Sequence, residues 1–217
     1  MRLPNAVQQE HPWVISRIAP DFQLLDVWAL PVRGRANDFP TLLEVMADLD
    51  PTGAGSTASR ALFWLRFRVG ALFGWDDPHR KFPVPGRVET SLTTRVPEDL
   101  RATARGLKLG VPGFVPLYRT NTEAAAEVSN ATVHGVLHLA WVHQGNGRYR
   151  GQMAVYVKPR GWLGDMYMAL IGPFRYLIVY PALMRQIENA WQARRAGPTH
   201  SGHAAQHGLS RVESQAK

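Results

Sequence analysis

The sequence predicts an α+β fold in which a curved antiparallel sheet wraps around a long C-terminal helix. Residues 123–158 read as three consecutive strands, and a long apolar segment with helical spacing follows them directly. Between His134 and Gln144, both sets of alternate residues are largely apolar, which indicates a strand that is covered on both faces. A sheet that is joined by hairpins and curved around a helix encloses a natural space for a ligand.

The composition fits one domain with a well-formed core. The chain has 217 residues, of which 45% are hydrophobic, and one domain is the expectation at this length. We expect this domain to span residues 20–196, after an N-terminal extension at 1–19 and before a disordered tail at 197–217. The absence of cysteine excludes disulfides, thiolate catalysis and sulfur-based zinc sites. The first residues show no apolar segment of a secretory signal, so the expected location is cytoplasmic.

The chain is basic, with 25 Lys and Arg, 17 Asp and Glu and a formal charge of +8. The arginines are dispersed without a run or a recognised binding motif, so nucleic acid is not an expected partner. Asp165 and Arg175 divide the last apolar segment into pieces shorter than the roughly 20 residues that cross a bilayer. A buried amphipathic helix is therefore preferred there, and attachment to a membrane surface is the alternative. The oligomeric state is left open.

A strand and a short helix are expected before residue 50. Residues 21–30, bounded by prolines, alternate as an opening strand. A loop at 31–37 leads to a helix that Asp38 caps and that has Pro40 in its first turn. This helix ends at Asp50, before the next proline.

The middle of the chain is less regular. After a flexible connector, residues 61–75 carry apolar side chains at helical spacing, with aromatic residues added, and predict a helix that is buried on much of its circumference. Residues 76–113 contain five prolines and mixed polarity. We therefore expect a loop there, with one short element near 96–105.

The second half of the chain predicts a run of strands followed by a helix. The strands are expected at 114–120, 123–130, 133–144 and 149–159, and the Asn-Gly step between the last two is a strong hairpin signal. From residue 161 to 195 the spacing becomes helical, with kinks expected at its prolines. One line of this helix contains Leu170, Phe174, Leu177, Pro181 and Met184, and we expect its Leu170, Phe174 and Leu177 to pack on the sheet.

Three strings carry a resemblance to a known family. They are ALFWLRFRVGALFGW, YRTNTEAAAEVSNATVHGVLHLAWV and GQMAVYVKPRGWLGDMYMALIGPFRYLIVYPALMR. Together they resemble the bacterial domain-of-unknown-function 2867 family over most of residues 20–190. That family is similar to the SRPBCC (Bet v 1-like, START-like) helix-grip superfamily. The resemblance implies a sheet curled around the C-terminal helix with a cavity between them. It also implies that some relatives are fused behind a Rossmann-type reductase, although this chain contains no GxGxxG. It implies no catalytic residue.

The candidate catalytic residues are Glu127, His134 and His138. The two histidines are four residues apart on a strand, which separates their side chains by about 13 Å, so they do not chelate one metal ion together. Glu127 or Asn130 on the neighbouring strand can approach one of them, and a histidine–carboxylate pair that faces a cavity serves general acid–base chemistry. The alternatives are a polar stripe that is hydrogen-bonded within the sheet and, without a motif to support it, a metal site formed by one histidine with Glu127.

A second set of residues is a candidate for ligand binding. Flat or lipid-like molecules are bound by aromatic side chains, and a cation inside an apolar helix reaches solvent or meets a carboxylate, either of the protein or of a ligand. The candidates are Tyr118, Asn130, Trp141, Tyr156, Phe174 and Arg175. Core packing is the alternative for the aromatic members.

The sequence therefore predicts a protein that binds a small apolar or amphipathic molecule in an internal cavity, without a cofactor or a metal ion. Two alternatives stay open. One is an enzyme of the lyase or cyclase type that acts on such a ligand by acid–base catalysis. The other is a non-catalytic partner of a reductase.

Overall fold

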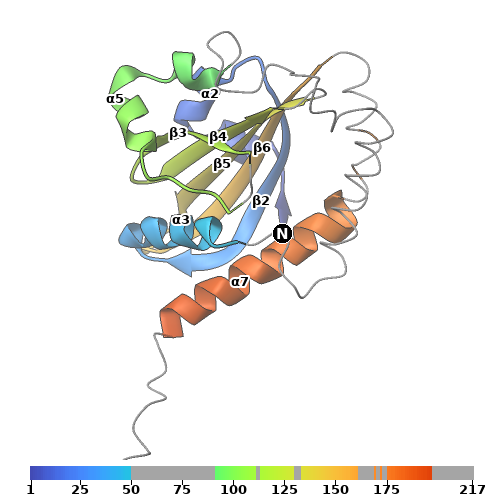
Figure 1. Cartoon of the computed structure of the whole chain (residues 1–217). Helices are drawn as coiled ribbons and strands as arrows, with labels where there is room; N and C mark the ends of the chain where they lie inside the picture. The colour runs from blue at the N-terminus through green and yellow to red at the C-terminus, as the bar shows by residue number, and fades with distance from the viewer. Residues whose placement is uncertain are drawn as a thin grey trace, which may run out of the picture.

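A six-stranded antiparallel sheet organises the described part of the chain (Figure 1). The computed structural model describes residues 1–49, 91–110, 113–129, 133–160 and 175–196, together with Ala169 and Gly172. The strand order is β1-β2-β6-β5-β4-β3. The strands are β1 (Arg2–Leu3), β2 (Gln23–Gly34), β3 (Val115–Arg119), β4 (Glu123–Ser129), β5 (Val133–His143) and β6 (Tyr149–Pro159). The expected helix at 61–75, with its connector, and the expected tail at 197–217 lie outside the described residues.

The four strands expected between residues 114 and 159 are confirmed, and all of their pairings are antiparallel. The hairpin between β5 and β6 turns through Gly145, Asn146 and Gly147, which have φ values of 86°, 51° and 67°. Glycine and asparagine are the residues that adopt positive φ at least cost, which explains this turn sequence. The helical turn α5 (Glu98–Arg101), with the 3₁₀ turns η2 (Leu92–Arg95) and η3 (Ala102–Ala104), forms the short element that was expected near 96–105.

The predicted end of the first strand is wrong, because β2 continues through Pro31 to Gly34. Proline has no N–H to donate, so it is tolerated only at an edge or a bulge of a sheet. Pro31 meets both conditions. It lies beyond Val27 and Trp28, which pair with β1, and within the irregular stretch of pairing to β6 between Ala29 and Arg33.

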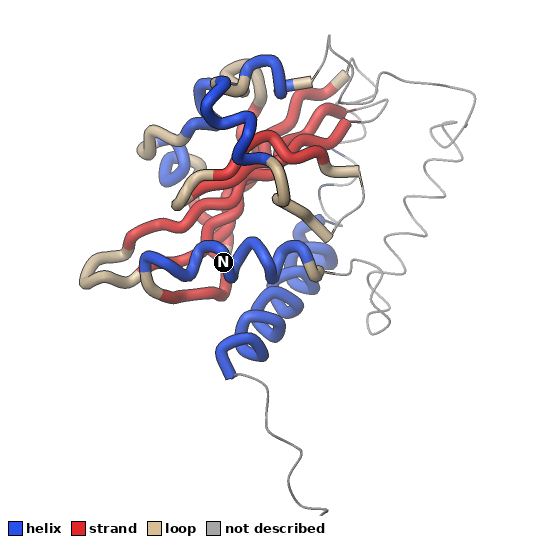
Figure 2. Tube along the Cα trace, turned by 60° about the vertical axis from the view of Figure 1, so that its left-hand side comes forward, coloured by secondary structure: helices blue, strands red, loops and turns tan. Residues whose placement is uncertain are grey.

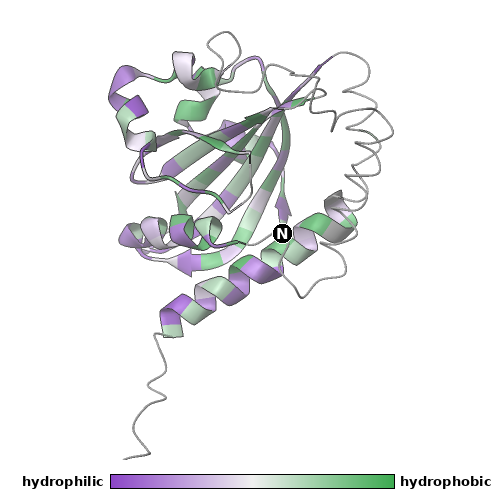
Figure 3. Cartoon of the chain, viewed as in Figure 1, coloured by the Kyte–Doolittle hydropathy of each residue, from purple (hydrophilic) through white to green (hydrophobic). Residues whose placement is uncertain are grey.

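One face of the sheet packs against two helices, α3 (Phe39–Ala47) and α7 (Tyr180–Ala196). Asp38 occupies the N-cap position of α3 and a proline its first turn, as the sequence predicts, but the Asp38 side chain accepts from the Arg35 N–H and makes no cap hydrogen bond to α3. The helix ends at Ala47 rather than at Asp50. Figures 1 and 2 show α7 crossing this side of the sheet at an angle, next to β2. Figure 3 shows mixed hydropathy along α7, which is the pattern of a helix with one buried side.

The predicted packing line of the last helix is wrong in its register. Leu177 is 76% exposed, and the buried residues of α7 are instead Tyr180, Ile187 and Trp191. The turn before α7, η4 (Arg175–Val179), is π-helical. A π turn contains more residues than an α turn, so it rotates the residues before it relative to those after it. A line drawn at constant helical spacing across this turn therefore does not stay on one face; Leu170 and Phe174, the first residues of the predicted line, lie outside the described residues.

The other face of the sheet is covered by the N-terminal segment and by η2. Residues 1–19 form β1 and two short helices, α1 (Ala6–Gln9) and α2 (Val14–Ile18). Ile15 and Ile18 are buried there against sheet residues such as Ala154. Both faces of β5 are thus covered, as its apolar alternation predicts.

A buried carboxylate connects β1, β2 and the last helix. Asp26 on β2 has no exposed surface and accepts hydrogen bonds from the hydroxyl groups of Tyr176 and Tyr180, the latter at 3.1 Å. Arg2 of β1 lies 3.5 Å from the same carboxylate, and its guanidinium lies 4.9 Å from the centre of the Tyr176 ring. This cluster fixes the start of α7 against the sheet.

Candidate functional site

Two glutamate–histidine pairs lie between β4 and β5 on the face that the N-terminal segment covers. Glu127 Oε2 is 2.9 Å from His134 Nε2, and Glu123 Oε2 is 2.9 Å from His138 Nε2. Each glutamate has one residue of β5 directly opposite it. The histidine of the pair comes two residues before that residue in the sequence. The pairs are therefore equivalent diagonal contacts, repeated after four residues or about 13 Å along the strands.

His138 belongs to a polar network that is closed to solvent. The Gln8 amide nitrogen donates to His138 Nδ1 at 3.1 Å and to the Tyr156 hydroxyl at 2.9 Å. Gln152 Nε2 donates to Gln8 Oε1 at 2.7 Å. Because an amide nitrogen only donates, Nδ1 of His138 accepts, and the ring proton lies on Nε2 and faces Glu123. The His138 side chain is 0% exposed, so this histidine holds the sheet and the N-terminal segment together.

Glu123 is also fully engaged inside the protein. It accepts hydrogen bonds from the Val14 backbone N–H, at 3.1 and 3.2 Å to its two oxygens, and from the Tyr118 hydroxyl at 2.8 Å. Burial alone would raise the pKa of Glu123, but His138, the Val14 N–H and Tyr118 outweigh it and hold that pKa below its usual range. Burial, followed by the charge of Glu123, raises the pKa of Tyr118. Glu123 is therefore an ionised anchor for the strand and for α2.

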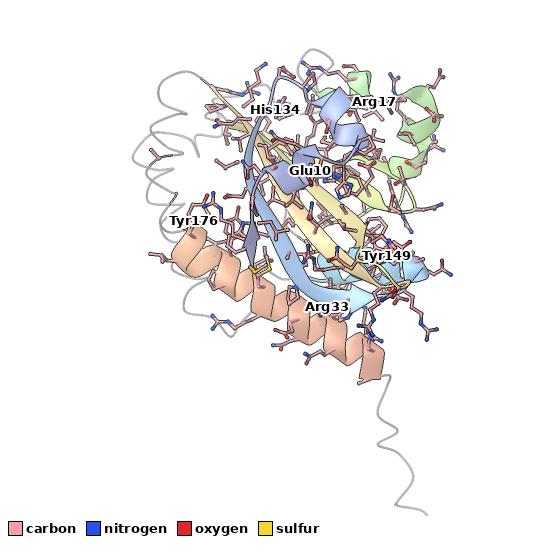
Figure 4. All side chains as sticks on the ribbon, turned by 180° about the vertical axis from the view of Figure 1, so that it is seen from behind. Glu10, Arg17, Arg33, His134, Tyr149 and Tyr176 are labelled. Carbon is pink, nitrogen blue, oxygen red and sulfur yellow. The ribbon has the colours of Figure 1, made fainter. Side chains whose placement is uncertain are left out.

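The Glu127–His134 pair differs because it borders a pocket. The pocket has a volume of about 280 Å³ and is lined by Phe22, Leu92, Arg95, His134, Lys158, Pro159 and Arg160. His134 is 8% exposed, and its ring lies edge-on to the Phe22 ring at 4.9 Å between centroids. Figure 4 shows His134 near one end of the sheet. One ring nitrogen of His134 is thus hydrogen-bonded to Glu127, and the rest of the ring borders the pocket.

Glu127 is also held by the start of η2, through its N-cap residue Ser91 and its first residue Leu92. The Leu92 N–H donates to Glu127 Oε2 at 2.9 Å, and the Ser91 hydroxyl donates to Oε1. Burial alone would raise the pKa of Glu127, but His134, Ser91 and the Leu92 N–H outweigh it, and the pKa lies below its usual range. Ser91 bonds to the carboxylate and not to the imidazole, so this is not the arrangement that activates a serine nucleophile.

Positive charge surrounds the same pocket. Lys158 Nζ lies 2.8 Å from Asp21, and Arg95 donates to the same carboxylate. These two cations hold the pKa of Asp21 well below its usual range. Arg160 donates to Ser129 Oγ at 2.7 Å. The three cations outnumber the two carboxylates nearby, Asp21 and the Glu127 that contacts His134, so a net positive charge remains beside His134.

The structure places the predicted ligand-binding residues in different environments. Tyr118, Trp141 and Tyr156 are buried, at 0%, 1% and 6% exposure. Trp141 lies on the face of α3 and α7, where its Nε1 donates to the Arg35 carbonyl at 2.8 Å, whereas the two tyrosines lie on the opposite face. Asn130 and Phe174 lie outside the described residues, as does the side chain of Arg175.

Sequence reasoning found both histidines and Glu127 but missed Glu123, Gln8 and Ser91. The spacing Glu123–Glu127 matches the spacing His134–His138, and this equality is the one signal of a repeated contact. Among the described residues, no group of three His, Asp or Glu side chains forms a metal site; His134 and His138 each contact one glutamate. No helix in the described ranges is long and apolar enough to cross a membrane.

The fold and the site define an α+β protein in which a curved antiparallel sheet carries a histidine–glutamate pair beside a basic pocket. The chain belongs to the DUF2867 family of proteins of unknown function, which it matches over residues 18–182. No curated protein matches the chain, and no solved structure matches it either.

Proposed function

We propose that this protein binds a small amphipathic molecule with an acidic group in the pocket beside His134. The observation that carries the proposal is the meeting of three features at this pocket: an apolar side formed by Phe22 and Leu92, a surplus of positive charge, and a histidine held by a buried glutamate. A volume of about 280 Å³ suits a small molecule or one end of a longer one.

The acidic group follows from the charges. Lys158 and Arg95 share the carboxylate of Asp21, and the side-chain partner of Arg160 among the described residues is a hydroxyl group. A carboxylate or phosphate of a ligand completes the coordination of these cations through charge-assisted hydrogen bonds. Phe22 then contacts the apolar part of the ligand, and the His134 imidazole donates to or accepts from its polar end.

A helix-grip fold of the SRPBCC type is part of the proposal. The antiparallel sheet with a C-terminal helix against it supports this assignment, as does the packing of Tyr180, Ile187 and Trp191 of α7 on the sheet side. The resemblance to that superfamily implies a ligand space, which agrees with a binding role.

An acid–base enzyme is the second candidate, and the Glu127–His134 contact at 2.9 Å favours it. A carboxylate that orients an imidazole beside a pocket is a general acid–base arrangement. In such an enzyme His134 is the catalytic residue that moves a proton of the bound ligand, and Glu127 is a positioning residue.

Native mass spectrometry of freshly purified protein tests the binding proposal. We expect a co-purified small molecule in the parent protein, and its loss in His134→Gln and in Lys158→Gln. His138→Gln is the matched control, because His138 has the same residue type, strand and glutamate contact but does not line the pocket. We expect this variant to retain the molecule wherever it stays folded by circular dichroism. Arg148→Gln, an exposed change outside the pocket, is a second control.

Two results would overturn the binding proposal. One is a parent protein that carries no molecule and binds neither short-chain carboxylates nor short-chain phosphates. The other is retention of the molecule by both pocket variants. Incubation of the identified molecule with the parent and with His134→Gln then separates the two candidates. Turnover by the parent that is lost in His134→Gln, with ligand affinity kept, assigns an enzyme.

A further inference from the structure

A larger groove lies between β2 and the second half of α7, away from the pocket at His134. Its volume is about 750 Å³. It is lined by Met1, Ala29, Leu30, Pro31, Arg33, Arg150, Met184, Glu188, Trp191, Gln192, Arg195 and Ala196. Figure 4 shows Arg33 beside α7 and His134 toward the opposite end of the sheet. Arg150 and Lys158, which line the two hollows, are eight residues apart on β6, or about 26 Å. The groove is therefore a separate site.

Three arginines gather at this groove. Arg33 and Arg150 are directly opposite each other on β2 and β6, and Arg195 Nη1 donates to the Arg33 carbonyl at 2.9 Å. Like charges directly opposite on neighbouring strands are destabilising. Burial, followed by the charge of Arg33, lowers the pKa of Arg150. The sheet thus holds two guanidinium groups together at a cost in stability.

These arginines lack a carboxylate partner within the described ranges. In the part of the chain that the structure describes, none of the three forms an ion pair, and Arg150 Nε is buried without a hydrogen-bond partner. Arg194, the neighbour of Arg195 on α7, shows the contrast, because it contacts both Glu44 and Asp48. A buried N–H without a partner is costly unless a ligand supplies the acceptor.

The rest of the groove provides an apolar surface and one carboxylate. Leu30 and Trp191 are buried at 2% and 5% exposure, and the half-buried Met184 lines the same groove. Glu188 is the carboxylate of the lining. Its contact in the described residues is a long one, 3.5 Å from Gln192 Nε2. Three positive charges and one negative charge leave a net attraction for anions.

We propose that this groove binds a second small amphipathic anion, whose phosphate or carboxylate is held by Arg150 and Arg33 with Arg195 at the rim, and whose apolar part lies on Met184 and Trp191. A guanidinium presents its N–H groups in a planar fork that matches two oxygens of one anion. The ligand supplies the acceptor that Arg150 Nε lacks and the negative charge that relieves the Arg33–Arg150 repulsion.

Isothermal titration calorimetry on the full chain tests this site, with hexyl phosphate and hexanoate as probes and 1-hexanol as the neutral control. We expect at least one of the two anions to bind the parent protein and hexanol not to bind. A comparison of the titrations with hexyl phosphate and with hexanoate shows which head group the arginines bind. Arg150→Gln and Arg33→Gln should each weaken binding about tenfold or more, whereas Arg148→Gln, an exposed arginine of the same strand region outside the groove, should leave it within about twofold. Glu188→Gln should strengthen binding, because it removes the opposing charge.

The melting temperatures of the variants distinguish a loss of binding from a loss of folding. Arg150→Gln removes a like-charge contact, so we expect an unchanged or higher melting temperature together with the loss of binding. If Arg150→Gln does not fold, Arg33→Gln and Arg195→Gln, both exposed positions, decide the result. The proposal is overturned if neither anion binds the parent, or if the arginine variants bind as Arg148→Gln does. Loss of hexyl phosphate binding in His134→Gln, with binding kept in Arg150→Gln, would also overturn it and assign the anion to the other pocket.

Discussion

His134 and His138 make the same diagonal contact with a glutamate of β4, yet their side chains are 8% and 0% exposed. The difference arises from what covers them. Gln8 and Trp13 of the N-terminal segment close over His138, whereas Phe22 and Leu92 leave a pocket beside His134. One contact is therefore enclosed in the core, whereas its repeat borders a pocket.

The two histidines should respond differently to the same substitution. His138→Gln should lower the free energy of unfolding by about 1–3 kcal/mol, because the buried side chains of Gln8 and Glu123 lose their hydrogen bonds to the imidazole ring. His134→Gln should cost less, about 1 kcal/mol or below, since water in the pocket can replace part of the contact. Urea unfolding followed by circular dichroism measures both changes. A larger loss for His134→Gln would contradict this assignment.

Stability should fall in acid because of the two buried glutamates. The pKa values of Glu123 and Glu127 lie below the ordinary 4.5 in the folded protein. The folded state therefore binds protons less readily than the unfolded state, so this contribution is complete above about pH 4.5 and is lost as the pH falls through the lower folded values. Urea unfolding at successive pH values between about 6 and 3 measures the slope. Glu127→Gln should make it shallower, and an unchanged slope would show that Glu127 is not coupled to folding.

Two glycines on the same face of the sheet should tolerate alanine differently. A Cβ at Gly151 would lie 2.6 Å from Val32 Cγ2 and 3.2 Å from Leu30, whereas a Cβ at Gly135 would meet its nearest neighbour at an ordinary 3.5 Å. We expect Gly151→Ala to destabilise the protein by about 1–3 kcal/mol through overpacking. Gly135→Ala should be neutral, or stabilising by up to about 1 kcal/mol through the unfolded state. Melting temperatures of the pair, measured side by side, test the packing against β2. Equal losses would mean that the crowding at Gly151 is relieved elsewhere.

The Asp26 cluster should behave as a coupled unit. Tyr180→Phe removes a hydroxyl group that donates to Asp26 at 3.1 Å, and we expect a loss of about 0.5–2 kcal/mol in the free energy of unfolding. Asp26→Asn, which weakens charge-assisted bonds at a fully buried site, should cost about 1–3 kcal/mol. The double variant should lose less than the sum, because both changes remove the same contact. Additive losses in a double-mutant cycle would show that the two residues act independently.

The strands between residues 114 and 159 could be predicted because their signals are local. Alternation of side chains and the Asn146–Gly147 turn are both properties of short segments. The extension of β2 through Pro31 could not be predicted in this way, since it depends on the strand lying at an irregular edge. The π turn before Tyr180 likewise changed the buried side of the last helix without a signal in the apolar spacing.

The candidate site was predicted only in part for a similar reason. The residue types drew attention to His134, His138 and Glu127, but the partner of His138 depends on the register between β4 and β5. Gln8 and Ser91 reach the glutamate–histidine pairs from positions far away in the sequence. Contacts of this kind follow from tertiary packing, which the periodicity of one segment does not encode.

The three consecutive alanines of β4, Ala124, Ala125 and Ala126, leave this strand with two nearly uniform faces. Such a strand would fit its neighbours almost equally well after sliding along them, because one methyl group replaces another. The glutamates at either end of the alanines remove this freedom. A shift by one residue would turn both carboxylates toward the side of α7 and leave two imidazoles unmatched beneath the N-terminal segment. The buried glutamate–histidine contacts of β4 therefore select a single pairing for a strand that hydrophobic contact alone would leave ambiguous.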